Sequence, residues 1–173
     1  MPGPDHPQYS GAMSQTILVL TEEALTRADL TTLRAVQGEE PAEFVVLVPE
    51  DRDESVVAGF FRHLSLLEVG EAFRSLSGDD PREEKATAEA AVEESLRVLA
   101  ADGLHGRGRT ATGSPVDALV REAAECAATQ AVVITRPDAL ADTFHTDWAS
   151  KAQDKLGIAV LHVYSDSGFI GDS

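Results

Sequence analysis

The chain has little of several features that would point to a specialised class of protein. Its single cysteine, Cys126, excludes an intramolecular disulfide. No apolar run approaches the roughly 20 residues that a membrane-spanning helix needs. The N-terminus also has no basic region followed by an apolar one, which a secretory signal would have. We therefore expect a cytoplasmic protein with no membrane partner.

Basic residues are also scarce, since 14 Lys and Arg stand against 30 Asp and Glu, for a net charge of −16. A surface this acidic repels phosphate backbones and anionic lipid, so nucleic acid is a poor partner as well. The 173 residues are enough for about one domain. We expect that domain at residues 14–165, preceded by a disordered tail or cloning remnant at 1–13 and followed by a C-terminal tail at 166–173.

What the chain does have is an alternation of strand and helix patterns. Continuous apolar runs rich in β-branched residues predict buried strands at 16–21, 44–48, 131–135 and 158–164. A further strand, at 106–113, is polar, which is typical of a sheet edge. Amphipathic helical stripes separate these strands. The pattern predicts a three-layer α/β domain built on a five-stranded parallel sheet.

Capping residues mark where several helices begin and end. Gly38 ends the helix that follows the first strand, and Pro81 and Pro115 each take the first position of a later helix. Residues 54–76 form a further apolar helical stripe. It packs either on the sheet or in a subunit interface, and the sequence leaves both arrangements open.

The order of these elements resembles the universal stress protein family over roughly residues 16–165. The resemblance rests on the opening strand Ile17-Leu18-Val19, a long second helix, Gly113-Ser114-Pro115 before the third helix, and a last strand after Gly157. It implies a Rossmann-like, adenine nucleotide alpha hydrolase-like fold with sheet order 3-2-1-4-5. Ligands of open α/β sheets bind at the carboxyl ends of the strands where the order reverses.

The resemblance therefore implies a ligand pocket at the carboxyl ends of strands one, two and four. The candidate pocket residues are Thr21, Glu22, Val48, Ser114, Thr135 and Arg136. Nucleotide-binding members of the family have an aspartate that closes the first strand, at or next to the position of Glu22, and a glycine-rich loop after the fourth strand. This chain has no glycine between Pro115 and Leu156, so its backbone lacks the residues that approach phosphates closely. We expect no ATP binding and no cofactor.

The acids after the first strand have two interpretations. Glu22 and Glu23 could bind a divalent cation, or they could be acids favoured at a helix N-terminus by the helix dipole. We favour the second and predict no metal site. Arg136 could bind an anion in the pocket, although a solvated loop arginine is the simpler interpretation.

Other functions of α/β domains lack their required residues here. A phosphoreceiver domain needs an aspartate that closes the third strand, where Thr112 and Gly113 stand. The Gly-x-Ser-x-Gly of a hydrolase and the glycine fingerprint of a dinucleotide-binding domain are both absent. With no recognisable nucleophile, base or metal ligand set, we do not expect an enzyme.

The leading hypothesis is a stress-response or regulatory protein that acts through contacts with an unknown protein partner. The alternative is a sensor of a small ligand, such as a nucleotide or an anion, in the candidate pocket. We also predict a homodimer paired along Ile158 to Val163, since this edge strand is mostly apolar and has no proline or charge. The C-terminal tail folding over the same edge is the other possibility.

Overall fold

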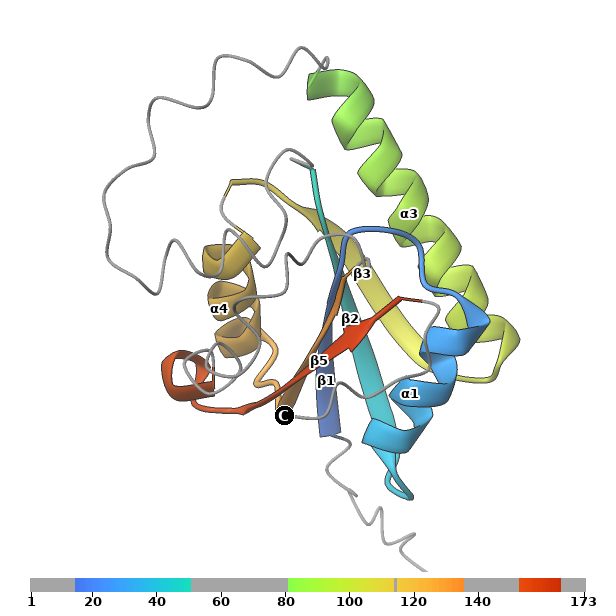
Figure 1. The fold of residues 1–173 in the computed structure, drawn as a ribbon, viewed down its shortest axis with the longest axis vertical. Helices are drawn as coiled ribbons and strands as arrows, with labels where there is room; N and C mark the ends of the chain where they lie inside the picture. The colour runs from blue at the N-terminus through green and yellow to red at the C-terminus, as the bar shows by residue number, and fades with distance from the viewer. Residues whose placement is uncertain (1–14, 51–80, 114, 136–152, 166–173) are drawn as a thin grey trace, which may run out of the picture.

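The computed structural model describes residues 15–50, 81–113, 115–135 and 153–165, which form a five-stranded sheet with helices on both faces (Figure 1). The strands are β1 (Gln15–Thr21), β2 (Ala42–Pro49), β3 (His105–Ala111), β4 (Gln130–Thr135) and β5 (Ala159–Tyr164). The longer helices among these residues are α1 (Arg27–Gln37), α3 (Pro81–Ala101) and α4 (Pro115–Glu125). Each observed strand overlaps a predicted one.

The sheet is parallel throughout, and its strands lie in the order β3-β2-β1-β4-β5. The predicted fold class and sheet order are confirmed. Val19 at the centre of β1 pairs with Val46 on one side and Val132 on the other. Because β1 has strands on both sides and helices over both faces, its apolar run is buried as the sequence predicts.

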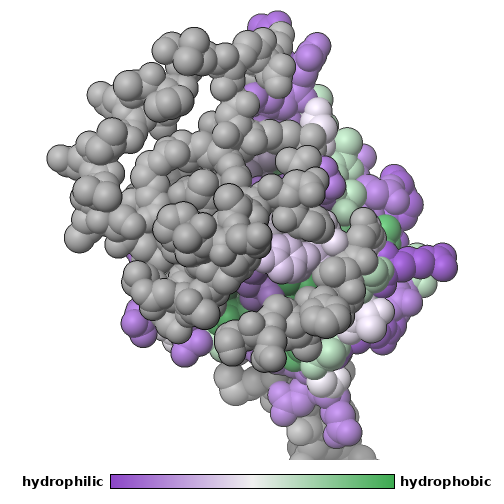
Figure 2. Space-filling model, in the orientation of Figure 1, coloured by the Kyte–Doolittle hydropathy of each residue, from purple (hydrophilic) through white to green (hydrophobic). Residues whose placement is uncertain are grey.

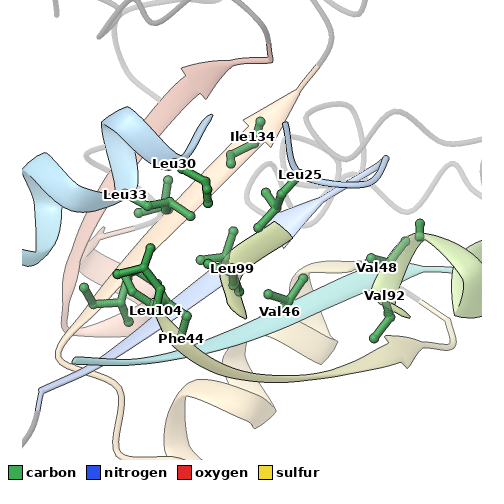
Figure 3. Packing of buried hydrophobic residues seen from close by; sticks show 14 of the residues in the cluster. Leu25, Leu30, Leu33, Phe44, Val46, Val48, Val92, Leu99, Leu104 and Ile134 are labelled. Carbon is green, nitrogen blue, oxygen red and sulfur yellow. The ribbon is translucent and has the colours of Figure 1, made fainter. Parts of the chain in front are cut away.

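Two hydrophobic clusters hold the layers together. Helices α1 and α3 cover one face of the sheet, and α4 covers the other (Figure 1). On the first face, Leu33 of α1 and Leu99 of α3 are fully buried with Phe44 of β2 in one cluster (Figure 3). On the second face, Leu119 of α4 packs with Leu18, Leu20 and their neighbours. Full burial of each such side chain contributes about 1.5–3 kcal/mol.

The start of α1 corrects one interpretation of the acids after β1. Thr26 is the N-cap: its hydroxyl accepts a hydrogen bond from the Asp29 backbone N–H, and the Asp29 carboxylate accepts one from the Thr26 N–H. The helix therefore begins at Arg27, and Asp29 is the acid in its first turn. Glu22 and Glu23 lie in the preceding loop, so a preference for the helix N-terminus does not explain them.

Several sequence predictions lie outside the described residues, namely the tails, the stripe at 54–76 and the stretch after β4 in which glycine is missing. Over α1 and α3 the described surface carries mostly hydrophilic residues, with scattered hydrophobic ones between them (Figure 2). None of the helices in the described part of the chain combines the length and the apolar character that a membrane span requires.

Candidate functional site

The carboxyl ends of β1 and β4 meet at the centre of the sheet, where the strand order reverses. Thr21 ends β1, Thr135 ends β4, and Thr21 pairs with Ile134 across the two strands. A hollow of about 20 Å³ opens at this point. The residues that line it are Thr21, Glu22, Glu23, Ala24, Thr26, Ile134, Thr135 and Ser165.

At the β1 side of the hollow, a side chain fixes the turn out of the strand. Thr21 is 3 % exposed, and its hydroxyl donates a hydrogen bond of 2.8 Å to the backbone oxygen of Glu23. The same hydroxyl accepts the Glu23 N–H at 3.4 Å. Such a local hydroxyl-to-backbone turn stops the strand and turns the chain into the loop. Glu22 is half-buried beside it, whereas Glu23 is exposed.

At the β4 side, Thr135 joins β4 to β5. Its hydroxyl shares a hydrogen bond of 2.7 Å with Nε2 of His162, and its backbone oxygen accepts the Ser165 N–H at 2.8 Å. The His162 ring meets Tyr164 edge-on, with ring centroids 5.0 Å apart. The edge strand β5 is thereby tied to a residue that lines the hollow. No sequence pattern indicates this role for His162, because only the β4–β5 register brings it beside Thr135.

The lining of the hollow is polar and acidic. Its hydroxyls and carboxylates offer hydrogen-bond acceptors, and no Lys or Arg is among the described residues that line it. A phosphate here would meet the Glu22 and Glu23 carboxylates, a repulsion of about 4 kcal/mol for each pair of unit charges 4 Å apart near a protein surface. A volume of about 20 Å³ has room for a single water, far below the roughly 300 Å³ of a small-molecule site.

The hollow brings together three of the six residues predicted for the pocket, namely Thr21, Glu22 and Thr135. Val48 is fully buried in the cluster beneath α1 and α3, and it does not line the hollow. Ser114 and Arg136 lie outside the described residues. Within the ranges that the structure describes, no group of three His, Cys, Asp or Glu side chains could hold a metal ion.

Sequence reasoning missed Ser95, which holds the loop between β1 and α1 in place. Its hydroxyl oxygen accepts the backbone N–H of Leu25 at 3.0 Å, across 70 residues of sequence. The available signal was a polar residue on an apolar helix face, since Ser95 lies between Val92 and Leu99 on the buried side of α3.

Cys126 lies away from the hollow, directly after α4, and is half-buried. Burial raises the pKa of its thiol, and the charge of Arg107 opposes that shift. A raised pKa leaves little thiolate at neutral pH, so this thiol is a poor nucleophile.

Comparison with known proteins supports the fold. No family model and no curated protein sequence matches this chain. Among solved structures, that of hypothetical protein MJ0577 is similar with a TM-score of 0.59 and 16 % identity, over 90 % of this chain and 99 % of that one. At this identity the likeness shows the fold alone.

Universal stress proteins are also among the similar structures. One, in complex with cAMP, has a TM-score of 0.48 and 19 % identity, over 88 % of this chain and 98 % of its own. Another, At3g01520 from Arabidopsis thaliana with AMP bound, has a TM-score of 0.46 and 12 % identity, over 88 % and 93 %. These lower scores carry no argument about ligands. The chain therefore shares the fold of the MJ0577 structure, and its parallel sheet has the strand order 3-2-1-4-5 that the resemblance implies.

Proposed function

We propose that this chain is a universal-stress-protein-like protein that acts through protein–protein contacts in a stress or regulatory response, as a homodimer paired along β5 and without ATP. The observation that carries the proposal is the position of β5 at the edge of the sheet. Ala159–Tyr164 contains no proline and no Lys, Arg, Asp or Glu, and Val160 and Leu161 are only half-buried. An uncharged apolar edge of this kind is a template for strand pairing.

A second copy of the chain is the occupant that fits this edge best. Two copies of β5 related by a two-fold axis would pair with each other, and the contact would close on itself instead of growing into a fibre. Light scattering during gel filtration at micromolar concentration tests this. We expect the mass of a dimer, and a monomer would contradict the proposal.

Two observations support the absence of ATP. Glu22 and Glu23 line the small hollow at the expected phosphate end, and the sequence has no glycine between Pro115 and Leu156. Calorimetric titration with ATP and Mg²⁺ is the direct test. We expect no binding in the micromolar range, where a Kd of about 1 μM would correspond to about −8.2 kcal/mol. Micromolar affinity would contradict this part of the proposal.

We expect no catalysis from this site. The described residues that line the hollow include no histidine, lysine or cysteine, and their hydroxyls and carboxylates match no recognised set of catalytic roles. His162 contacts Thr135 from β5, but it is not among the lining residues.

A sensor of a small ligand is the second candidate function, favoured by the polar side chains at the switch point of the sheet. Thr21, Glu22 and Thr135 place hydroxyls and a carboxylate at the switch point of the sheet. Ser114 and Arg136, which the sequence also predicts for this site, lie outside the described residues. A thermal-shift screen of metabolites tests it. A ligand at 100 times its Kd adds about 2.7 kcal/mol, which for a domain of this size raises the Tm by about 5–10 °C. A screen with no shift would reject this candidate.

A further inference from the structure

Ser95 is the one polar residue on the buried side of α3 within the described part of that helix. It is 0 % exposed, and the neighbouring side chains on the same side are the apolar Ala88, Ala91, Val92 and Leu99. A serine has a lower helix propensity than alanine and adds no apolar contact at such a position. We therefore expect its hydroxyl to make hydrogen bonds to buried polar groups.

Both hydrogen-bonding functions of this hydroxyl are in use. It donates to the backbone oxygen of Ala91 at 2.7 Å, and it accepts the backbone N–H of Leu25 at 3.0 Å. Leu25 is 2 % exposed and lies in the loop between β1 and α1, where no strand or helix ladder reaches its N–H. Its side chain lies in the same packed layer as Leu99 of α3 (Figure 3).

The loop that Ser95 holds carries half of the residues that line the hollow. Residues 22–24 and Thr26 line the hollow on either side of Leu25. The loop is fixed at its start by Thr21 with Glu23 and at its end by Thr26 with Asp29. Both of those contacts are local. The bond between Leu25 and Ser95, in contrast, connects the loop to a different layer of the protein.

We propose that Ser95 is a positioning residue: through its bond to Leu25, α3 sets the place of the β1–α1 loop and hence of the Glu22 and Glu23 carboxylates. This inference rests on the ligand site proposed above as the second candidate function. It makes the position of α3 a determinant of the site, although α3 itself does not line the hollow.

Hydrogen exchange of individual amides, followed by NMR, tests the hydrogen bond between Ser95 and Leu25. In Ser95→Ala the Leu25 N–H loses its acceptor, and we expect it to exchange about tenfold faster, with shifts of the amide signals of residues 22–26. The Leu30 amide, which bonds to Thr26 within α1, should keep its rate. Thr87→Ala is the matched control, because Thr87 makes the same bond to the carbonyl four residues before it on α3 but lies on the exposed side of the helix. That variant should leave Leu25 unchanged.

A second variant separates the hydrogen bond from packing. Ser95→Cys leaves no cavity and replaces the oxygen with a weak acceptor, so Leu25 should exchange faster there as well. An unchanged Leu25 rate in Ser95→Ala overturns the inference. So does a normal rate in Ser95→Cys combined with a fast rate in Ser95→Ala, since a cavity would then be the cause.

These results are independent of ligand binding. If the loop loosens in Ser95→Ala and no metabolite shifts the Tm, the proposed ligand site is wrong, while the role of Ser95 in holding the loop is supported. If the screen finds a ligand whose Kd is the same in Ser95→Ala and in the parent protein, the site stands and the positioning role is overturned.

Discussion

The two edges of the sheet are built in opposite ways. The edge strand β3 reads HGRGRTA and carries two arginines, whereas the edge strand β5 reads AVLHVY and carries no Lys, Arg, Asp or Glu. Both strands have one side without a partner strand among the described residues. The comparison shows that an edge position alone does not dictate composition, and that the neighbours on each face do.

On β3, the two faces are divided between glycine and arginine. A Cβ added at Gly108 would lie 2.8 Å from Cγ1 of Val92, so α3 approaches the strand too closely for any side chain. On the other face, Arg107 lies 3.2 Å from Glu43, and Arg109 pairs with Glu122 of α4. Charged side chains on an edge strand hinder pairing with another chain. This edge is therefore protected by the residues that pack it.

The ion pairs on β3 include a buried carboxylate. Glu122 is 2 % exposed, whereas the Arg107 and Arg109 side chains are 53 % and 50 % exposed. Arg109 also reaches Glu125 at 2.8 Å. A buried charge is tolerated only when it is paired, so Glu122 depends on the two arginines.

The largest effect is expected from removing both arginines of β3. Arg107→Met with Arg109→Met leaves the Glu122 carboxylate buried without these two cations, which should lower the free energy of unfolding by roughly 3–5 kcal/mol. Urea denaturation measures it. Adding Glu122→Gln should recover most of the loss, since no charge then remains buried.

Arg97→Met is the control for that double variant, because Arg97 pairs with Glu94 on the exposed surface of α3. An exposed pair of this kind is worth about 0.5 kcal/mol or less. A double variant that costs no more than this control would show that the β3 ion pairs are not structural.

The next largest effect is expected on dimerisation through β5, the edge strand without Lys, Arg, Asp or Glu. Leu161→Lys puts a charge on β5 and should weaken the proposed dimer by about 100-fold in Kd, or about 2.7 kcal/mol, because pairing would bury that charge. His105→Lys places the same charge on β3 and should leave the dimer intact. Light scattering over a dilution series compares the two. Circular dichroism checks that both variants are folded. If both dimers then dissociated equally, the proposed difference between the β3 and β5 edges would be wrong.

The glycine face of β3 should show a smaller and graded effect. Gly108→Ala should cost roughly 1–3 kcal/mol, because the new methyl meets the stiff branch of Val92 and a backbone oxygen at 3.1 Å. Gly106→Ala meets the movable end of Leu99 at 2.8 Å and should cost less. Thermal unfolding of the two variants gives the comparison. If Gly106→Ala lowered the stability more than Gly108→Ala, this explanation by side-chain stiffness would be wrong.

The smallest effect is expected in the pH dependence of Cys126 alkylation, which depends on the charge of Arg107. Burial raises the pKa of this thiol and Arg107 lowers it, so iodoacetamide alkylation should begin at a higher pH than for an ordinary thiol. Arg107→Met removes the opposing charge, and the profile should move further up in pH, by less than tenfold in rate at a given pH because Arg107 is half-exposed. A profile that moves down would contradict this arrangement of charges.

The sequence predicted most of the fold through local patterns. The apolar runs that became β1, β2 and β4 are long enough and uniform enough to be buried on both faces, and no other element type suits them. The polarity of β3 also predicted its edge position. The sheet order came from the resemblance to a family, because several orders satisfy the same local patterns.

The candidate site was only partly predictable. Thr21, Glu22 and Thr135 follow from the rule that ligands bind where strands end, and the hollow contains all three. Val48 obeys the same rule, yet it lies one residue before the end of β2 and its side chain is buried in the core beneath α1 and α3. Ser95 and His162 were missed because their partners are distant in sequence.

The sequence by itself determined where the described strands and helices form and which strands carry charged side chains, because these depend on the side chains of a few neighbouring residues. The tertiary structure alone decided that Ser95 holds Leu25, that Arg109 meets Glu122 and that Thr135 meets His162. Such contacts are set by the register of the strands and by the distance at which helices pack on them. Both result from the packing of the whole domain, so no stretch of the chain encodes them locally.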